Sequence, residues 1–307
     1  MKFLVTGDMG FLGKRVRDTL EAKGHTVAGF DLARKQNILD ADDIAAAISA
    51  RQYDTVIHLA AVADLNFFQT DVATCHKINV QGTQNVLQSC EDAGVRMIFA
   101  GTCCSYGNNG SHPSTEKSSL APTEPYAASK VECENLIRKV GGDHCIMRLA
   151  TFYGPGMRAA LCPAVFIDRA HRGLPLMIHG DGQQTRTFTY VDDVVSGIET
   201  IATSAPIYDV INVTSEESIS VVRIAELARE ITGNYVPLVH AKDREGQIYK
   251  EHILNTRLRS MGWEPKIDIS TGMILSYEDY KLQGGWVQPA GVNGKIVAKA
   301  NNNLKGY

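Results

Sequence analysis

Tyr126 and Lys130 are a tyrosine and a lysine with a spacing that suits acid–base chemistry. They stand four residues apart in a stretch that predicts a helix from about residue 126 to 139, and side chains at this separation share one helix face. An ammonium group close to a phenol lowers the pKa of the phenol, which makes tyrosinate available as a general base near neutral pH. The same spacing also occurs on exposed helix faces, so the surrounding sequence must decide.

Thr102 is a third candidate, just before this pair in the chain. It follows the apolar run 97–100, which predicts a strand. Polar residues at the carboxyl ends of parallel strands collect at one edge of the sheet, where active sites form. We therefore expect the Thr102 hydroxyl to share a proton with Tyr126 through a substrate oxygen.

Gly7, Gly10 and Gly13 follow an apolar run at residues 2–6 and open a helical pattern. Glycine at such a turn lets the backbone approach a pyrophosphate, and the helix N-terminus supplies unpaired N–H groups. A tight turn with close helix–strand packing would use the same residues. The strand–turn–helix context favours dinucleotide binding.

Asp31 ends the next apolar run, residues 26–30, and stands 18 residues beyond Gly13. A carboxylate there accepts hydrogen bonds from the adenosine ribose and repels the 2′-phosphate of NADP, which predicts NAD. Arg34 and Lys35 weaken this prediction, because a nearby cation can accommodate that phosphate.

The elements that position these residues alternate between strands and helices in the first half of the chain. Repeated strand–helix–strand units predict an α/β fold with a Rossmann-type doubly wound parallel sheet. Pro and Gly become denser after about residue 150, which predicts a smaller C-terminal α/β substrate-binding lobe. Further predicted elements are strands at 55–59 and 144–149 and helices at 42–50, 79–93, 163–171 and 221–232.

The predicted domain organisation is discontinuous. Residues 1–150, together with about 186–212, form the NAD-binding domain. The substrate lobe comprises about 151–185 and 213–283. The Gly- and Asn-rich tail, 284–307, is expected to be irregular.

Composition excludes several classes of protein. The 307 residues carry a formal net charge of −3 and are 44% hydrophobic and 21% charged, which offers no basic face for nucleic acid. No apolar run reaches the roughly 18 residues of a membrane span, and no signal peptide is recognisable. The seven cysteines form no C-x-x-C pair or Cys/His cluster, which predicts reduced thiols, a cytoplasmic protein and no metal.

Taken together, the ordered motifs resemble the extended short-chain dehydrogenase/reductase family. Within it, the chain is similar to the NAD-dependent nucleotide-sugar epimerase/dehydratase group, of the UDP-glucose 4-epimerase kind. The resemblance covers about residues 1–280. Besides Thr102 and Tyr126-x-x-x-Lys130, its motifs are TGDMGFLG (6–13), VIHLAA (56–61), NVQGTQN (79–85), RLATFYGP (148–155), GDGQQTR (180–186) and YVDD (190–193).

The resemblance implies NAD as the cofactor, a nucleotide-sugar substrate and catalytic roles for Thr102, Tyr126 and Lys130. It implies that Asn79 orients Lys130, and that a homodimer forms through the helices near 79–93 and 126–139. The cofactor contacts that it implies are Gly7, Gly10, Phe11, Leu12, Gly13, Asp31, Leu32, Asn37, Ile38, Leu59, Ala60, Ala61, Asn79, Tyr126 and Lys130. The substrate contacts are Thr102, Thr151, Arg186 and Arg244, with the two arginines gripping the diphosphate.

Some positions depart from the pattern of the group. Cys103 and Cys104 stand where 4,6-dehydratases carry the Asp–Glu pair that eliminates water. They are either a weaker, thiol-based pair or small residues that line the pocket. Thr151 and Ala160 replace common asparagines, and Gln247 replaces an aspartate, which leaves the nucleotide open.

The leading functional prediction is 4-epimerisation of a UDP-sugar through a transient 4-keto intermediate. The alternatives are a nucleotide-sugar dehydratase, with Cys103 and Cys104 as its acid–base pair, or a decarboxylase. The sequence singles out no cation for the substrate carboxylate that a decarboxylase needs. A non-catalytic NAD(P)-binding regulator remains as a different class, although the presence of Thr102, Tyr126 and Lys130 favours an enzyme.

Overall fold

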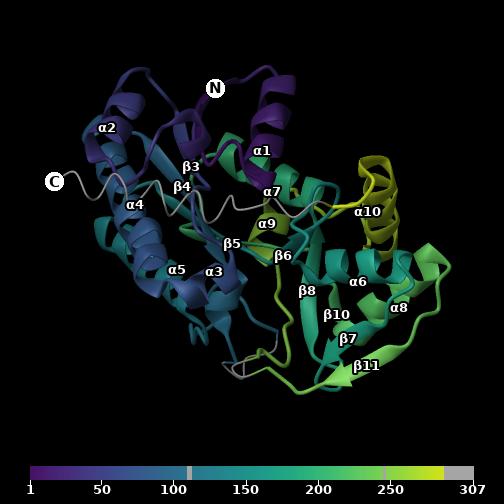
Figure 1. Cartoon of the computed structure of the whole chain (residues 1–307). Coiled ribbons are helices and arrows are strands. Elements are labelled where there is room, and N and C mark those ends of the chain that lie inside the picture. The colour runs from purple at the N-terminus through teal and green to yellow at the C-terminus, as the bar shows by residue number, and fades with distance from the viewer. Residues whose placement is uncertain (109–112, 245–246, 287–307) are drawn as a thin grey trace.

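A six-stranded parallel sheet forms the centre of the larger lobe (Figure 1). The structure is a computed structural model and describes residues 1–108, 113–244 and 247–286. The strands lie in the order β2–β1–β3–β4–β5–β9, so the strand order reverses between β1 and β3. Their bounds are β1 Lys2–Thr6, β2 Thr26–Phe30, β3 Thr55–His58, β4 Arg96–Thr102, β5 Cys145–Leu149 and β9 Val210–Val213.

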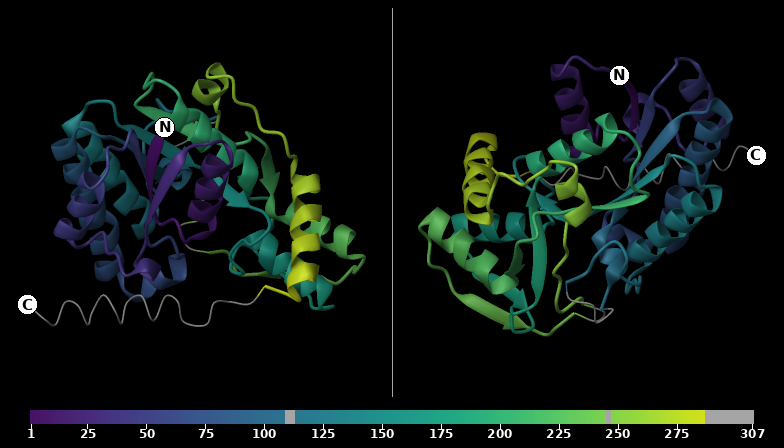
Figure 2. Two further views of the ribbon diagram at one scale, coloured as in Figure 1. Left: turned by 90° about the horizontal axis from the view of Figure 1, so that it is seen from above. Right: turned by 180° about the vertical axis from the view of Figure 1, so that it is seen from behind.

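Helices cover both faces of this sheet, as Figure 2 shows from two further sides. On one face lie α1 (Phe11–Ala22) and α7 (Val191–Thr203), whose buried side chains share a core with β1 and β5. On the other face lie α2 (Ala41–Ser49), α4 (Val72–Ala93) and α5 (Pro125–Val140). Because both faces are covered, β3 and β5 are buried along their whole length. The Rossmann-type α/β fold is confirmed.

Helix α4 begins seven residues earlier than the predicted start at residue 79. Asp71 caps it by accepting a hydrogen bond from the amide of Thr74, and the left-handed Gly94 ends it. The short helix α3 (Leu65–Thr70), which the sequence did not reveal, precedes this cap.

The smaller lobe has a hydrophobic core of its own. A three-stranded sheet, β10–β8–β6, and a two-stranded sheet, β11–β7, pack with three helices. The strands are β6 Thr151–Tyr153, β7 Leu176–His179, β8 Thr185–Tyr190, β10 Ser218–Ser220 and β11 Leu238–Ala241. The helices are α6 Cys162–His171, α8 Val221–Thr232 and α10 Ile269–Gln283.

The boundary between the lobes differs in two places from the predicted one. Strand β8 belongs to the sheet of the smaller lobe, so the chain returns to the larger lobe only from α7 onward, not from residue 186. Leu258 of α9 (Thr256–Ser260) and Trp263 also pack into the core of the larger lobe. In the predicted tail, Trp286 packs on Tyr280 at 5.0 Å between ring centroids, and residues 287–307 lie outside the described residues.

Candidate functional site

The loop after β1 is shaped to bring backbone close to a ligand. Gly7 has a φ of +73°, and a Cβ there would lie 2.8 Å from the amide nitrogen of Ala60 in the loop after β3. A Cβ on Gly13 would lie 2.0 Å from the carbonyl oxygen of Gly7. Only glycine fits at either position, and the N-terminus of α1 then faces the gap between β1 and β3. This reversal of strand order is where such sheets bind dinucleotides.

The loop after β3 forms the other side of this gap. Leu59, Ala60 and Ala61 are half-buried there, and the amide of Ala60 donates to Thr6 Oγ1 at 3.2 Å. Asn79 of α4 fixes the next turn by exchanging two hydrogen bonds with the backbone of Val62.

Asn79 also reaches the catalytic helix. Its side-chain amide donates to the Oγ of Ser129 at 3.2 Å. Ser129 directly precedes Lys130 in the chain. Its predicted role in orienting Lys130 therefore has a route through Ser129, and that role stays a prediction.

Asp31 lies at the end of β2, close to the glycine loop. Its Oδ2 accepts from the amide of Met9 at 3.3 Å, and its Oδ1 caps the short helix η1 (Leu32–Arg34) through the amide of Ala33. This position suits a contact with the adenosine ribose.

The other predicted cofactor contacts differ in how accessible they are. Asn37 Oδ1 accepts from the amide of Leu39, and Ile38 is only 7% exposed. Gly10 is exposed, Phe11 and Leu32 are half-buried, and Leu12 is buried in the core. These arrangements fit a bound NAD, with the contribution of Ile38 and Leu12 limited by their burial.

The three predicted catalytic residues gather at the carboxyl end of β4. Thr102 ends the strand, and its Oγ1 accepts from the amide of Cys104 at 3.2 Å. Lys130 donates to the carbonyl oxygen of Ala100 at 2.9 Å and lies 4.7 Å from the ring centroid of Phe99. Tyr126 is half-buried one turn earlier on α5, with its ring edge-on to Phe68 at 5.9 Å.

The electrostatics of this group differ from the prediction. Burial raises the pKa of Tyr126, whereas the spacing of the pair predicts that Lys130 lowers it. The positive charge that opposes this rise is that of Arg158. Burial lowers the pKa of Lys130 to about 8, partly offset by charges on Cys133 and Glu134. Lys130 thus holds its proton less firmly than an exposed lysine does.

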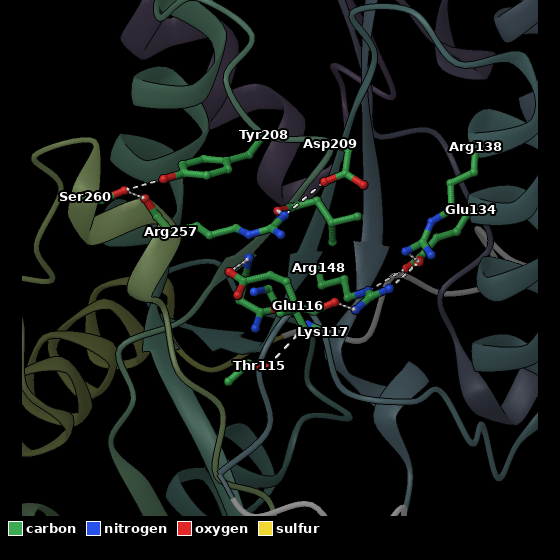
Figure 3. A network of polar contacts seen from close by, with 12 residues as sticks. Thr115, Glu116, Lys117, Glu134, Arg138, Arg148, Tyr208, Asp209, Arg257 and Ser260 are labelled. Atoms are coloured by element: carbon green, nitrogen blue, oxygen red, sulfur yellow. Dashed lines mark hydrogen bonds and ion pairs between the residues drawn. The ribbon is translucent and has the colours of Figure 1, made fainter.

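A buried ion pair links α5 to β5 (Figure 3). Both oxygens of Glu134 accept from Arg148 on β5, at 2.9 and 2.6 Å, and both side chains are almost fully buried. Arg148 also donates to the hydroxyl of Tyr106 at 3.0 Å and stacks on its ring. This network fixes the helix that carries Tyr126 and Lys130 to the strand beside β4.

Cys103 and Cys104, the predicted thiol pair, lie directly after β4, the first buried and the second half-buried. The thiol of Cys103 donates to the carbonyl of Arg148 and packs in a cluster with Tyr106. Burial raises the pKa of Cys103 well above its ordinary value and that of Cys104 to about 12. Both thiols therefore stay protonated near neutral pH. The raised pKa values and the hydrogen bond of Cys103 favour small, packed side chains over an acid–base pair, and the catalytic roles of Cys103 and Cys104 stay a prediction.

The predicted diphosphate contacts Arg186 and Arg244 lie on β8 and in the segment after β11. Arg186 on β8 is half-buried and donates to the carbonyls of Thr185 and Ile248, at 2.7 and 2.6 Å. Arg244 is exposed. Burial raises the pKa of Cys162 at the start of α6 to about 12, and the positive charges of Arg186 and Arg244 oppose this rise. Thr151 is half-buried at the start of β6.

Sequence patterns did not point to Arg158, whose side chain contacts the loop after β3. Its guanidinium donates to the carbonyl of Ala63 at 2.9 Å, and its charge acts on Tyr126. Arg158 follows the Gly154-Pro155-Gly156 turn after β6, and its hydrogen bond joins this segment to the loop after β3. It is a cation close to the reacting group.

The described residues lack two further kinds of feature. Among the helices of residues 1–286 outside the two short gaps, none is long and apolar enough to cross a bilayer. Within the same residues, no three His, Cys, Asp or Glu side chains cluster as a metal site.

The fold and the glycine loop define a dinucleotide-binding α/β protein with a second, smaller lobe. Residues 3–214 match the model of the NAD dependent epimerase/dehydratase family, which is more than half of the chain. The chain belongs to this family and is similar to its NAD-dependent enzymes.

Three of its relatives show how far the likeness extends. The uncharacterised UDP-glucose epimerase YtcB of Bacillus subtilis is 30% identical over 280 residues, which cover 80% of this chain and 86% of the relative. The UDP-glucose 4-epimerase of Thermotoga maritima, solved with UDP-glucose, has a TM-score of 0.87 at 28% identity, covering 92% of this chain and 99% of that chain. The UDP-glucuronic acid 4-epimerase of Bacillus cereus, solved with UDP-glucuronic acid and NAD, has a TM-score of 0.84 at 25% identity, covering 92% and 100%.

Proposed function

We propose that this protein is an NAD-dependent 4-epimerase of a UDP-sugar. The observation that carries the proposal is the meeting of Thr102, Tyr126 and Lys130 at the end of β4, next to the loops after β1 and β3. The relatives that act on UDP-sugars support the choice of nucleotide.

Each residue of the proposed site has a role that follows from its position. The ionised form of Tyr126, which its raised pKa makes scarce near neutral pH, takes the proton of the sugar 4-hydroxyl, and Thr102 hydrogen-bonds the same oxygen as it becomes a ketone. Lys130, held by the carbonyl of Ala100, orients the ribose next to the tyrosine. NAD supplies the hydride acceptor and donor at C4. Arg186 and Arg244 hold the diphosphate while the 4-keto sugar turns its other face.

Proton NMR in D₂O with UDP-, dTDP-, CDP- and GDP-sugars tests the proposal. We expect a C4 epimer of a UDP-sugar without deuterium at C5. The matched variant Tyr126→Phe keeps the ring contact with Phe68 and should lower turnover by about 100-fold or more while retaining NAD. A keto or unsaturated product, or deuterium at C5, would replace epimerisation by elimination. Full activity in Tyr126→Phe would refute the assigned roles.

Arg158 favours a uronic acid as the sugar. A guanidinium close to Tyr126 is suited to pair with a carboxylate at C5 of the sugar, and one similar structure holds UDP-glucuronic acid. We propose UDP-glucuronate as the second candidate substrate. Arg158→Gln should then lower kcat/KM for UDP-glucuronate by about tenfold or more and leave that for UDP-glucose within a fewfold. Equal losses for both sugars would contradict this choice, and release of CO₂ would indicate a decarboxylase.

The assembly and the compartment are further parts of the proposal. We propose a homodimer in which α4 and α5, which pack side by side (Figure 1), pair with their copies. Their outward side chains include Gln81, Gln88 and Glu132, so such an interface would be polar. Sedimentation tests this, and a monomer at micromolar concentration would refute it. All seven cysteines are free, which supports a reducing cytoplasm.

A further inference from the structure

Asp8 is a fully buried carboxylate inside the glycine loop, and the proposed reaction does not use it. Its Oδ2 accepts from Arg34 Nη2 at 2.8 Å and from Arg17 Nη1 at 2.8 Å. Arg34 Nε lies 3.2 Å from both carboxylate oxygens. The side chain of Arg34 is nevertheless 43% exposed, on the short helix that follows Asp31.

A glycine on the neighbouring strand leaves room for this carboxylate. Gly29 on β2 lies directly beside it, and a Cβ on Gly29 would lie 2.1 to 2.5 Å from the carboxyl carbon and oxygens of Asp8. Strand β2 therefore leaves room beside the loop for the carboxylate of Asp8, which pairs with Arg34. A charge-assisted contact at 2.8 Å also fixes the direction of the guanidinium.

We propose that Asp8 sets the preference of this protein for NAD over NADP by pairing with Arg34, so that its guanidinium is not free to bind a 2′-phosphate. An arginine close after the acidic residue of β2 is the group that can accept a 2′-phosphate in this fold. Here Asp31 accepts from the amide of Met9 at the end of β2, and Arg34 pairs with Asp8. The inference rests on the proposed NAD-dependent function and names the residue that selects its cofactor.

The test measures binding and needs no sugar. Purified protein is equilibrated with equal concentrations of NAD and NADP, free nucleotide is removed, and the bound dinucleotides are released with acid and quantified by chromatography. Asp8→Asn retains the size of the side chain and removes its charge. We expect it to raise the bound NADP-to-NAD ratio by about tenfold or more, because a freed guanidinium pairs with the phosphate.

Two second substitutions, each added to Asp8→Asn, identify the side chain that binds the 2′-phosphate of NADP. Adding Arg34→Ala to Asp8→Asn should abolish the gain in NADP, whereas adding Lys35→Ala should preserve it. In the otherwise unchanged protein, Arg34→Ala should leave the ratio as it is, since the arginine is already occupied. This last variant changes a half-exposed side chain and keeps the test usable if Asp8→Asn does not fold.

Specific results would overturn the inference. A folded Asp8→Asn protein with an unchanged ratio refutes it, as does a gain that survives the loss of Arg34. A several-fold loss of NADP binding in the single Arg34→Ala variant refutes it too, because Arg34 would then already be available. If the unchanged protein binds neither dinucleotide, the NAD-dependent function itself fails, which is a separate outcome.

Discussion

The buried pair of Glu134 and Arg148 makes a quantitative prediction for Glu134→Gln. The glutamine has the size of glutamate but lacks its charge, so Arg148 is left 1% exposed with no carboxylate beside it. Removing one partner of a buried ion pair typically costs about 3–5 kcal/mol of unfolding free energy. Two short hydrogen bonds, at 2.6 and 2.9 Å, are lost or weakened, which places the expected cost within that range.

Urea unfolding followed by circular dichroism measures this cost. Arg138→Ala is the matched control, because Arg138 contacts the same carboxylate at 3.2 Å from a side chain that is 43% exposed. Its loss should cost about 1 kcal/mol or less. Replacing both buried partners, as in Glu134→Leu with Arg148→Met, should cost less than Glu134→Gln alone, because no unpaired charge remains.

Two results would refute this reasoning. A cost for Glu134→Gln no larger than that for Arg138→Ala would show that the buried charge is solvated in some other way. A double replacement that costs as much as the two single changes added together would show that the two side chains act independently.

Three further predictions concern single positions. Gly29→Ala should destabilise the protein by about 1–3 kcal/mol through overlap with the carboxylate of Asp8, and should cost far less in an Asp8→Ala background, as measured by urea unfolding. Burial and the charge of Lys130 lower the pKa of His58 from 6.5 to about 3. Only the unfolded chain therefore binds this proton between those values, so stability should fall as pH drops from 6.5 toward 3, and His58→Gln should flatten this decline in unfolding measured at a series of pH values. Cys104→Ala should keep epimerase turnover within a fewfold in the NMR assay, because its thiol is protonated, whereas a large loss would restore a chemical role for it.

Local patterns predicted most of the larger lobe. The strand at residues 26–30 and the helix at 221–232 have the predicted bounds, because apolar spacing and flanking glycines mark their ends. Helix α10 was missed, since its apolar side chains form no single stripe. Ile269 and Met273 are buried while Ile274 and Leu282 are exposed. Strand β8 was assigned to the wrong sheet, because periodicity does not identify a pairing partner.

The residues of the candidate site also separate into those that local sequence patterns indicate and those that depend on the folded chain. Spacing and strand ends predicted the positions of Gly7, Thr102 and Tyr126, because these depend on local sequence, and their roles stay predictions. Arg158 and the pair of Asp8 with Arg34 depend on segments that meet only after folding. The direction of the pKa shift of Tyr126 was also wrong, because burial is a property of the folded chain.

The repeated passage of the chain between the two lobes has a practical consequence. Strand β9 completes the central sheet after the chain has already built β6 and β8 in the smaller lobe, and Trp263 then returns to the core of the larger lobe. A fragment that ends near residue 150 would leave the edge of β5 unpaired and one face of the sheet without α7. The smaller lobe is therefore not one continuous segment of the chain, and it cannot be exchanged between relatives by replacing a single segment. Altering the substrate range calls for substitutions within the lobe, made side chain by side chain.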